Sequence, residues 1–141
     1  MVEFLAIGAH AVRRADVKPG QRVLVVGTGP IGMAAITFSR LRGANVTALD
    51  TRENRLAFRK RELKADATVQ IGEHDKDQLS KLTNGEFFDV VFDATGNPRD
   101  GARLRVHRPR WQVRAGVDRA GPHLLRRSRV PQARGDAAGE P

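Results

Sequence analysis

Three glycines in this chain follow one another at a spacing that suits phosphate binding. The segment from Gly27 to Gly32, GTGPIG, fits the pattern G-x-G-x-x-G, comes directly after an apolar β-branched run and opens an amphipathic segment. In such a turn the first glycine permits a tight bend, the second admits a pyrophosphate close to the backbone, and the third lets a helix pack on a strand. Free N–H groups and the positive helix end would face the phosphates. The pattern therefore predicts dinucleotide binding at Gly27, Gly29 and Gly32.

An acidic residue follows at the end of the next predicted strand. Asp50 lies 18 residues after Gly32, where a carboxylate can accept both hydroxyls of an adenosine ribose and would repel a 2′-phosphate. Arg52 and Arg55 would suit a 2′-phosphorylated cofactor, but Asp50 occupies the discriminating position. NAD is therefore the expected cofactor. The alternative is a strand-to-helix loop in which Asp50 only caps a helix.

The elements that must position these residues alternate between strands and helices. Arg22–Val26 (RVLVV) is a short continuous apolar run, as expected for a parallel strand buried on both faces. Further strands are predicted at 45–49, 67–71 and 87–92. Helices are predicted at 3–14, from the glycine turn to a left-handed cap at Gly43, after Asp50, and at 75–82. This alternation predicts an α/β fold, a partial Rossmann doubly wound parallel sheet with strand order 3-2-1-4.

Apolar spacing predicts which side of each helix faces the sheet. On the first helix the expected inward residues are Leu5, Ala9 and Val12. On the helix after the glycine turn they are Ile31, Ala34, Ala35, Phe38 and Leu41. The charged helix is expected to turn Leu56, Ala57 and Leu63 inward and to leave in water Arg59, Lys60 and Arg61.

Composition divides the chain near Pro98. Residues 1–98 carry 14 Lys and Arg against 12 Asp and Glu, whereas residues 99–141 carry 11 Arg against 4 acidic residues. Cysteine is absent, which excludes disulfides, thiolate catalysis and cysteine-ligated zinc. Apolar runs fall short of the roughly 18–20 residues of a membrane span, and the first residues lack signal-peptide features. We expect a cytoplasmic protein without a membrane partner.

Four segments of the chain resemble one family. MVEFLAIGAHAVRRADVKPGQRVLVVGTGPIG is similar to the start of the nucleotide-binding domain of zinc-type medium-chain dehydrogenases, near the sorbitol and sugar-acid branch. GANVTALD, RLAF–LKADATV and FDATGNP continue the resemblance through residues 1–98. It implies that the backbone of Gly29, Pro30 and Ile31 holds the pyrophosphate and that Asp50 holds the ribose. It also implies that Arg55 lies against the adenine, and that the strand end near the cofactor consists of Ala94, Thr95 and Gly96.

The resemblance also implies a zinc-dependent activity, NAD-dependent oxidation of a secondary alcohol on a sugar or sugar acid. Relatives place a zinc-carrying catalytic domain before this segment, and we expect residues 1–98 to be a truncated NAD-binding domain without it. Glu3 matches an acidic residue that approaches the zinc in relatives, but a helix N-terminal carboxylate explains it equally well. The four histidines have no ligand spacing. We therefore expect no metal site, no catalytic residue, weak or vestigial NAD binding and no activity of this chain alone.

The Arg-rich segment 99–141 has two interpretations. It is expected to be disordered, and a one-base frameshift near Arg99 would explain its excess of Arg without Lys, since the shifted frame permits family-like strings. The alternative is a basic arm for nucleic acid, although Trp111 is its only aromatic residue and no binding motif is present. Non-specific sticking to nucleic acid is expected in either case. An exposed edge at the fourth strand would allow homo-oligomer formation.

Overall fold

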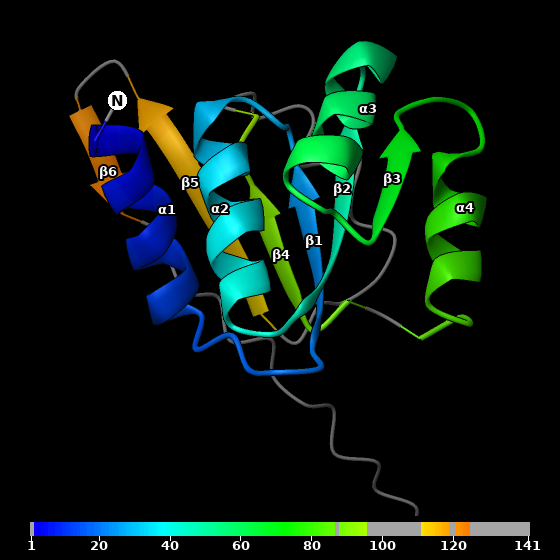
Figure 1. Cartoon of the computed structure of the whole chain (residues 1–141), viewed down its shortest axis with the longest axis horizontal. Helices are drawn as coiled ribbons and strands as arrows, with labels where there is room; N and C mark the ends of the chain where they lie inside the picture. Colours follow the sequence, from blue (N-terminus) through cyan, green and yellow to red (C-terminus); the bar gives the residue numbers. More distant parts are fainter. Residues whose placement is uncertain (1, 87, 96–110, 119–120, 125–141) are drawn as a thin grey trace, which may run out of the picture.

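The computed structural model describes residues 2–86, 88–95, 111–118 and 121–124. A six-stranded sheet has the order β3-β2-β1-β4-β5-β6. Its first five strands are parallel, and β6 runs antiparallel to β5 (Figure 1). The strands are β1 Arg22–Val26, β2 Asn45–Asp50, β3 Ala67–Gln70, β4 Val90–Asp93, β5 Trp111–Asp118 and β6 Gly121–Leu124. The helices are α1 Val2–Arg14, α2 Pro30–Leu41, α3 Glu53–Glu62 and α4 Asp75–Leu82.

Strand β1 divides the core into two layers. Val23 and Val25 are fully buried in a cluster with residues of α1, α2 and α3, whereas Leu24 and Val26 are buried in a cluster with Leu79 of α4. Side chains alternate between the two faces of a strand, so a strand covered on both faces needs an uninterrupted apolar sequence. Burying one such side chain stabilises the fold by about 1.5–3 kcal/mol. The run RVLVV therefore supplies both layers of the core.

The predicted α/β class and the order 3-2-1-4 are confirmed. The fourth strand was predicted at 87–92 and runs from Val90 to Asp93. Just before it, Asp89 contacts β1 through two bonds: its amide donates to the Arg22 carbonyl at 2.9 Å, and its carboxylate accepts from the Arg22 amide at 2.8 Å. Two segments of the tail, β5 and β6, are strands, so the expectation of disorder does not extend to them. The backbone of β5 pairs with β4, so the predicted open edge at β4 is wrong. The homo-oligomer inferred from that edge stays a prediction, and the rest of the tail lies outside the described residues.

Three residues predicted to face inward are exposed instead. Leu5 is 48% exposed, because α1 contacts α2 through Gly8, where an added Cβ would collide with Ala34. Leu41 is 76% exposed, since it lies about 140° around α2 from fully buried Ile36. Ala57 of α3 is exposed as well. The left-handed cap at Gly43 is confirmed by its φ of 78°.

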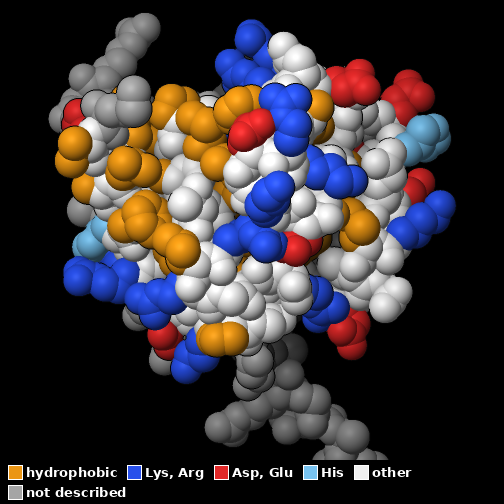
Figure 2. All heavy atoms as spheres, in the orientation of Figure 1, with side chains coloured by type: hydrophobic (Ala, Val, Ile, Leu, Met, Phe, Trp, Pro, Cys, Tyr) orange, Lys and Arg blue, Asp and Glu red, His pale blue; other side chains and the backbone are white. Residues whose placement is uncertain are grey.

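One face of the molecule carries an apolar cluster beside a basic one. Figure 2 shows hydrophobic side chains gathered toward α1 and α2, and Lys and Arg side chains gathered around α3. Val2 and Phe4 at the start of α1 are 80% and 39% exposed. Within the described ranges, no helix combines the length and apolar content that crossing a membrane requires.

Candidate functional site

The glycine-rich turn begins where β1 ends. Gly27 has a φ of 79°, a conformation that side chains of L-residues rarely adopt, and its amide donates to the Leu49 carbonyl at 2.8 Å. A Cβ at Gly27 would lie 3.0 Å from three atoms of Thr95. The first glycine is thus required both by its backbone angle and by the closeness of the chain after β4.

A Cβ added at either of the other two glycines would meet very different surroundings. A Cβ at Gly32 would collide with the carbonyl oxygen of Gly27, so helix α2 can approach the turn only because residue 32 has no side chain. A Cβ at Gly29, in contrast, would meet nothing within 4 Å. Gly29 has extended backbone angles, φ −67° and ψ −171°, that any residue can adopt. Its lack of a side chain is therefore not needed for folding and leaves open space beside the backbone.

The N-terminus of α2 borders this open space. Pro30 is the first helical residue, where its missing N–H costs nothing. The first intrahelical bond runs from the Met33 amide to the Gly29 carbonyl at 2.8 Å. No side chain among the described residues caps the helix. The amides of Ile31 and Gly32 in this first turn are thus available to an anion, and the helix dipole favours one there.

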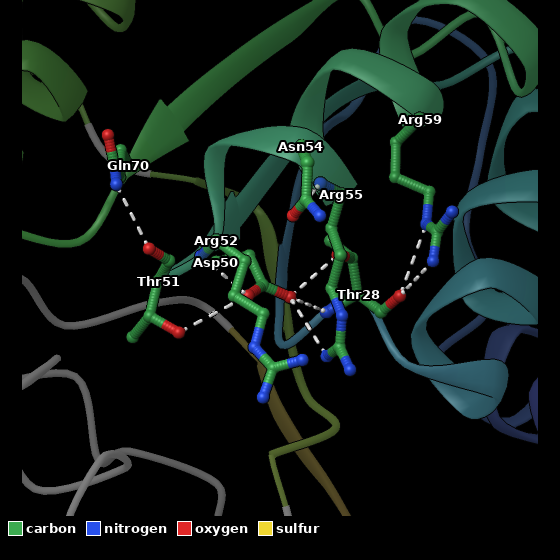
Figure 3. A network of polar contacts seen from close by, with 8 residues as sticks. All are labelled: Thr28, Asp50, Thr51, Arg52, Asn54, Arg55, Arg59 and Gln70. Atoms are coloured by element: carbon green, nitrogen blue, oxygen red, sulfur yellow. Dashed lines mark hydrogen bonds and ion pairs between the residues drawn. The ribbon is translucent and has the colours of Figure 1, made fainter.

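Asp50 is held in a network of hydrogen bonds at the end of β2. Its Oδ2 accepts from the Thr28 amide at 2.8 Å and from the Thr28 hydroxyl at 2.6 Å. Its Oδ1 accepts from the Arg52 amide at 3.1 Å and from the Thr51 hydroxyl at 3.4 Å. Figure 3 shows these contacts converging on the carboxylate. Burial raises the pKa of Asp50, but the bonds from Thr28 and Arg52 and the charge of Arg55 outweigh it and hold the pKa below its ordinary value.

Two arginine side chains lie near this carboxylate. Arg55 Nη1 lies 3.9 Å from Asp50 Oδ2, and the Arg55 side chain is 42% exposed. The exposed Arg52 side chain directs its guanidinium to the same side in Figure 3, with no dashed contact drawn to it. The position predicted to contact adenine, Arg55, therefore lies beside Asp50. Its contact with adenine stays a prediction.

Arg59 is the residue of this site that sequence reasoning missed. It was expected in water but is 8% exposed, and its Nε and Nη2 donate to the Thr28 carbonyl at 3.1 and 2.7 Å. Burial and the nearby charge of Arg55 lower the pKa of Arg59. The signal was its spacing, because Leu56, Arg59 and Leu63 lie at i, i+3 and i+7 on one helix face. Arg59 thereby fixes the glycine-rich turn from α3.

The end of β4 completes the site. Val26 pairs with Asp93 in the parallel register of β1 and β4, and the Ala94 amide donates to the Val26 carbonyl at 2.8 Å. Thr95 follows against Gly27, and Gly96 lies outside the described residues. The switch point of the sheet lies between β1 and β4, where ligands of open α/β sheets bind. The predicted residues brought to this edge are Gly27, Gly29, Pro30, Ile31, Gly32, Asp50, Arg55, Ala94 and Thr95.

A zinc site does not fit the residues that the structure describes. Among them, no group of three His, Cys, Asp or Glu side chains gathers as a metal ligand set. Glu3 is exposed in the first turn of α1.

The glycine-rich turn, the N-terminus of α2 and the acidic end of β2 lie at one edge of a parallel α/β sheet. The family model described as zinc-binding dehydrogenase matches residues 30–103, more than half of the chain, so the chain belongs to this family. It is similar to L-galactonate-5-dehydrogenase of Escherichia coli, with 40% identity over 97 residues, 69% of this chain and 28% of the relative. It is also similar to sorbitol dehydrogenase of Arabidopsis thaliana, with 39% identity over 102 residues, 68% of this chain and 28% of the relative.

Solved structures agree with this family. L-idonate 5-dehydrogenase of Escherichia coli matches with a TM-score of 0.70 and 31% identity over 82% of this chain and 34% of its own. Alcohol dehydrogenase TADH of Thermus sp. ATN1 matches with a TM-score of 0.72 and 28% identity over the same shares. The chain is thus homologous to zinc-dependent polyol and sugar-acid dehydrogenases, and it spans about 28% of the length of the two curated relatives.

Proposed function

We propose that this chain binds NAD at the carboxyl edge of its sheet, as the nucleotide-binding part of a dehydrogenase that oxidises a secondary alcohol of a polyol or sugar acid. The observation that carries the proposal is the division of roles among three glycines. Gly27 is required by its backbone angle and Gly32 by helix packing, whereas Gly29 borders open space. Because the fold would accept a side chain at residue 29, a glycine there suits a ligand that approaches the backbone.

The proposed binding mode uses this chain's own groups. The amides of Gly29, Ile31 and Gly32, at the uncapped start of α2, would donate to the pyrophosphate. Asp50 and Arg55 lie where the adenosine half would extend, and Thr95 borders the turn on the opposite side. NAD supplies hydride transfer when bound. The protein's part in this proposal is to hold the pyrophosphate and orient the two halves.

Replacing Gly29 tests this function without disturbing the fold. Gly29→Val places a side chain in the open space, and its extended backbone angles accept valine without strain. We expect the thermal midpoint to change little and NADH affinity, followed by nucleotide fluorescence, to fall at least tenfold.

The matched control is Gly72→Val after β3, where an added Cβ likewise meets nothing within 4 Å. It should leave NADH binding unchanged. Equal NADH affinity of the unaltered chain and Gly29→Val, or no NADH binding at all, would overturn the proposal.

A further inference from the structure

The carboxylate of Asp93 is buried at the end of β4. Asp93 is 7% exposed, and Val26, the residue paired with it in β1, is apolar and fully buried. Burying a carboxylate opposes folding unless hydrogen bonds compensate it. Within the described residues, both bonds of the Asp93 side chain come from Thr95, whose amide donates to Oδ1 at 3.2 Å and whose hydroxyl donates to it at 2.7 Å. The buried acceptor of Asp93 therefore serves the residue two positions further along the chain.

These two bonds fix how Thr95 lies against the glycine-rich turn. The Thr95 hydroxyl is held by Asp93, and a Cβ added at Gly27 would lie 3.0 Å from Thr95 Cα, Cγ2 and N. The methyl group and the backbone of Thr95 thus face Gly27, while the hydroxyl faces Asp93. Because threonine is branched at Cβ, a rotation about χ1 would move the methyl group and the hydroxyl together. Asp93 thereby determines which side of Thr95 borders the turn.

Thr95 lies on the side of the glycine-rich turn opposite Asp50. Strand β1 has two neighbours, β2, which ends in Asp50, and β4, which leads to Thr95. A dinucleotide whose pyrophosphate contacts Gly29 spans the crevice at this switch point, with one half on each side of β1. With the adenosine half beside Asp50, the other half passes Thr95. The orientation of the Thr95 side chain then affects the nicotinamide half and leaves the adenosine half unaffected.

We propose that Asp93 is a positioning residue, which holds the Thr95 hydroxyl and so sets the surface that the end of β4 presents to the nicotinamide half. This inference rests on the proposed function and adds to it a residue that contacts no ligand itself. A hydrogen bond to a carboxylate is stronger than one to a neutral acceptor, so it keeps Thr95 in one rotamer. Without this bond the side chain occupies several rotamers, and binding has to select one of them, which lowers the affinity.

Calorimetric titration of the whole chain with NADH and with 5′-ADP, which lacks the nicotinamide half, tests this inference. Thr95→Val is nearly isosteric and removes the hydroxyl, so NADH affinity should fall about fivefold, the equivalent of one hydrogen bond, and ADP affinity should change less than about twofold. Asp93→Leu should have the same effect, whereas Asp93→Asn keeps an acceptor oxygen and should retain most of the NADH affinity. Thr83→Val is the matched control and should change neither affinity, because this buried hydroxyl donates to the Leu79 carbonyl of α4.

The outcomes separate this inference from the proposed function. Unchanged NADH affinity in Thr95→Val, with NADH still bound by the unaltered chain, would overturn the inference and leave the proposed function intact. Equal losses of NADH and ADP affinity would show general damage to the turn and would also contradict the inference, as would a loss in Asp93→Asn as large as in Asp93→Leu. If Asp93→Leu does not fold, the nearly isosteric Thr95→Val decides alone. Absence of NADH binding to the unaltered chain would overturn the proposed function and this inference together.

Discussion

At the scale of single residues, two carboxylates fix the backbone, one buried (Asp50) and one partly exposed (Asp66). Asp50 receives the Thr28 and Arg52 amides, and Asp66 receives the Val46 amide at 2.7 Å and Arg40 Nη1 at 2.6 Å. Burial raises the pKa of Asp66, but the bonds from Arg40 and Val46 hold it below its ordinary value. Both carboxylates therefore bind these donors more strongly in their charged form than when protonated.

This predicts loss of stability in acid. A pKa lowered by folding means that the carboxylate stabilises the folded state above its unfolded pKa, about 3.9, and that this contribution disappears as the pH falls through the lower folded pKa. Asp66→Asn should lower the free energy of unfolding at pH 7 by about 1 kcal/mol, since its exposed pair with Arg40 adds little. It should also flatten the decline below pH 4.

Urea unfolding followed by circular dichroism between pH 2.5 and 7 measures this. Asp77→Asn on α4, where the side chain is 77% exposed, is the matched control. If the free energy of unfolding falls equally steeply below pH 4 in Asp66→Asn and in the unaltered chain, the assigned role of Asp66 is contradicted.

At the scale of elements, helix α3 serves the core and the site through one face. Leu56 is buried in the core, and one turn later Arg59 reaches the Thr28 carbonyl.

The alternation of strands and helices was predictable because buried parallel strands need continuous apolar runs and the glycine pattern marks the turn. Arg59 was predicted to lie in water because charged side chains usually do. Its hydrogen-bond partner, the Thr28 carbonyl, is 31 residues away in the sequence, and the spacing of residues within α3 cannot identify such a partner. The hydrogen bonds that hold Asp50 likewise come in part from Thr28, 22 residues away.

Arg59 is therefore predicted to position the turn. Arg59→Met keeps much of the apolar stem but leaves the Thr28 carbonyl without its donors, which should lower the free energy of unfolding by about 1–3 kcal/mol. NADH affinity should fall as well, because the turn that presents the Gly29 amide loses its support. Arg61→Met is the control on the same helix, since Arg61 is 74% exposed and pairs only with neighbouring Glu62 among the described residues.

Urea unfolding and NADH titration of the two variants decide this. Identical behaviour of Arg59→Met and Arg61→Met would show that the buried guanidinium has no positioning role.

At the scale of the whole molecule, the sheet order decides where a ligand lies. In the sheet, β1 lies between β2 and β4, and the glycine-rich turn follows β1 at the edge between these two neighbours. Gly27, Asp50 and Thr95 come from three strand ends that are far apart in sequence, and the parallel register brings them to one edge. We expect the Arg-rich residues 99–141 to compete for phosphate ligands, since 11 arginines attract anions without specific geometry.

The most direct test of dinucleotide binding at the glycine-rich turn is a backbone amide NMR titration of the ¹⁵N-labelled chain with NADH. Binding at this turn predicts that the amide resonances of Gly29, Ile31 and Gly32 shift most, with smaller shifts at Thr95 and none along α4. Shifts confined to residues 99–141, or no saturable shift at the turn, would contradict it.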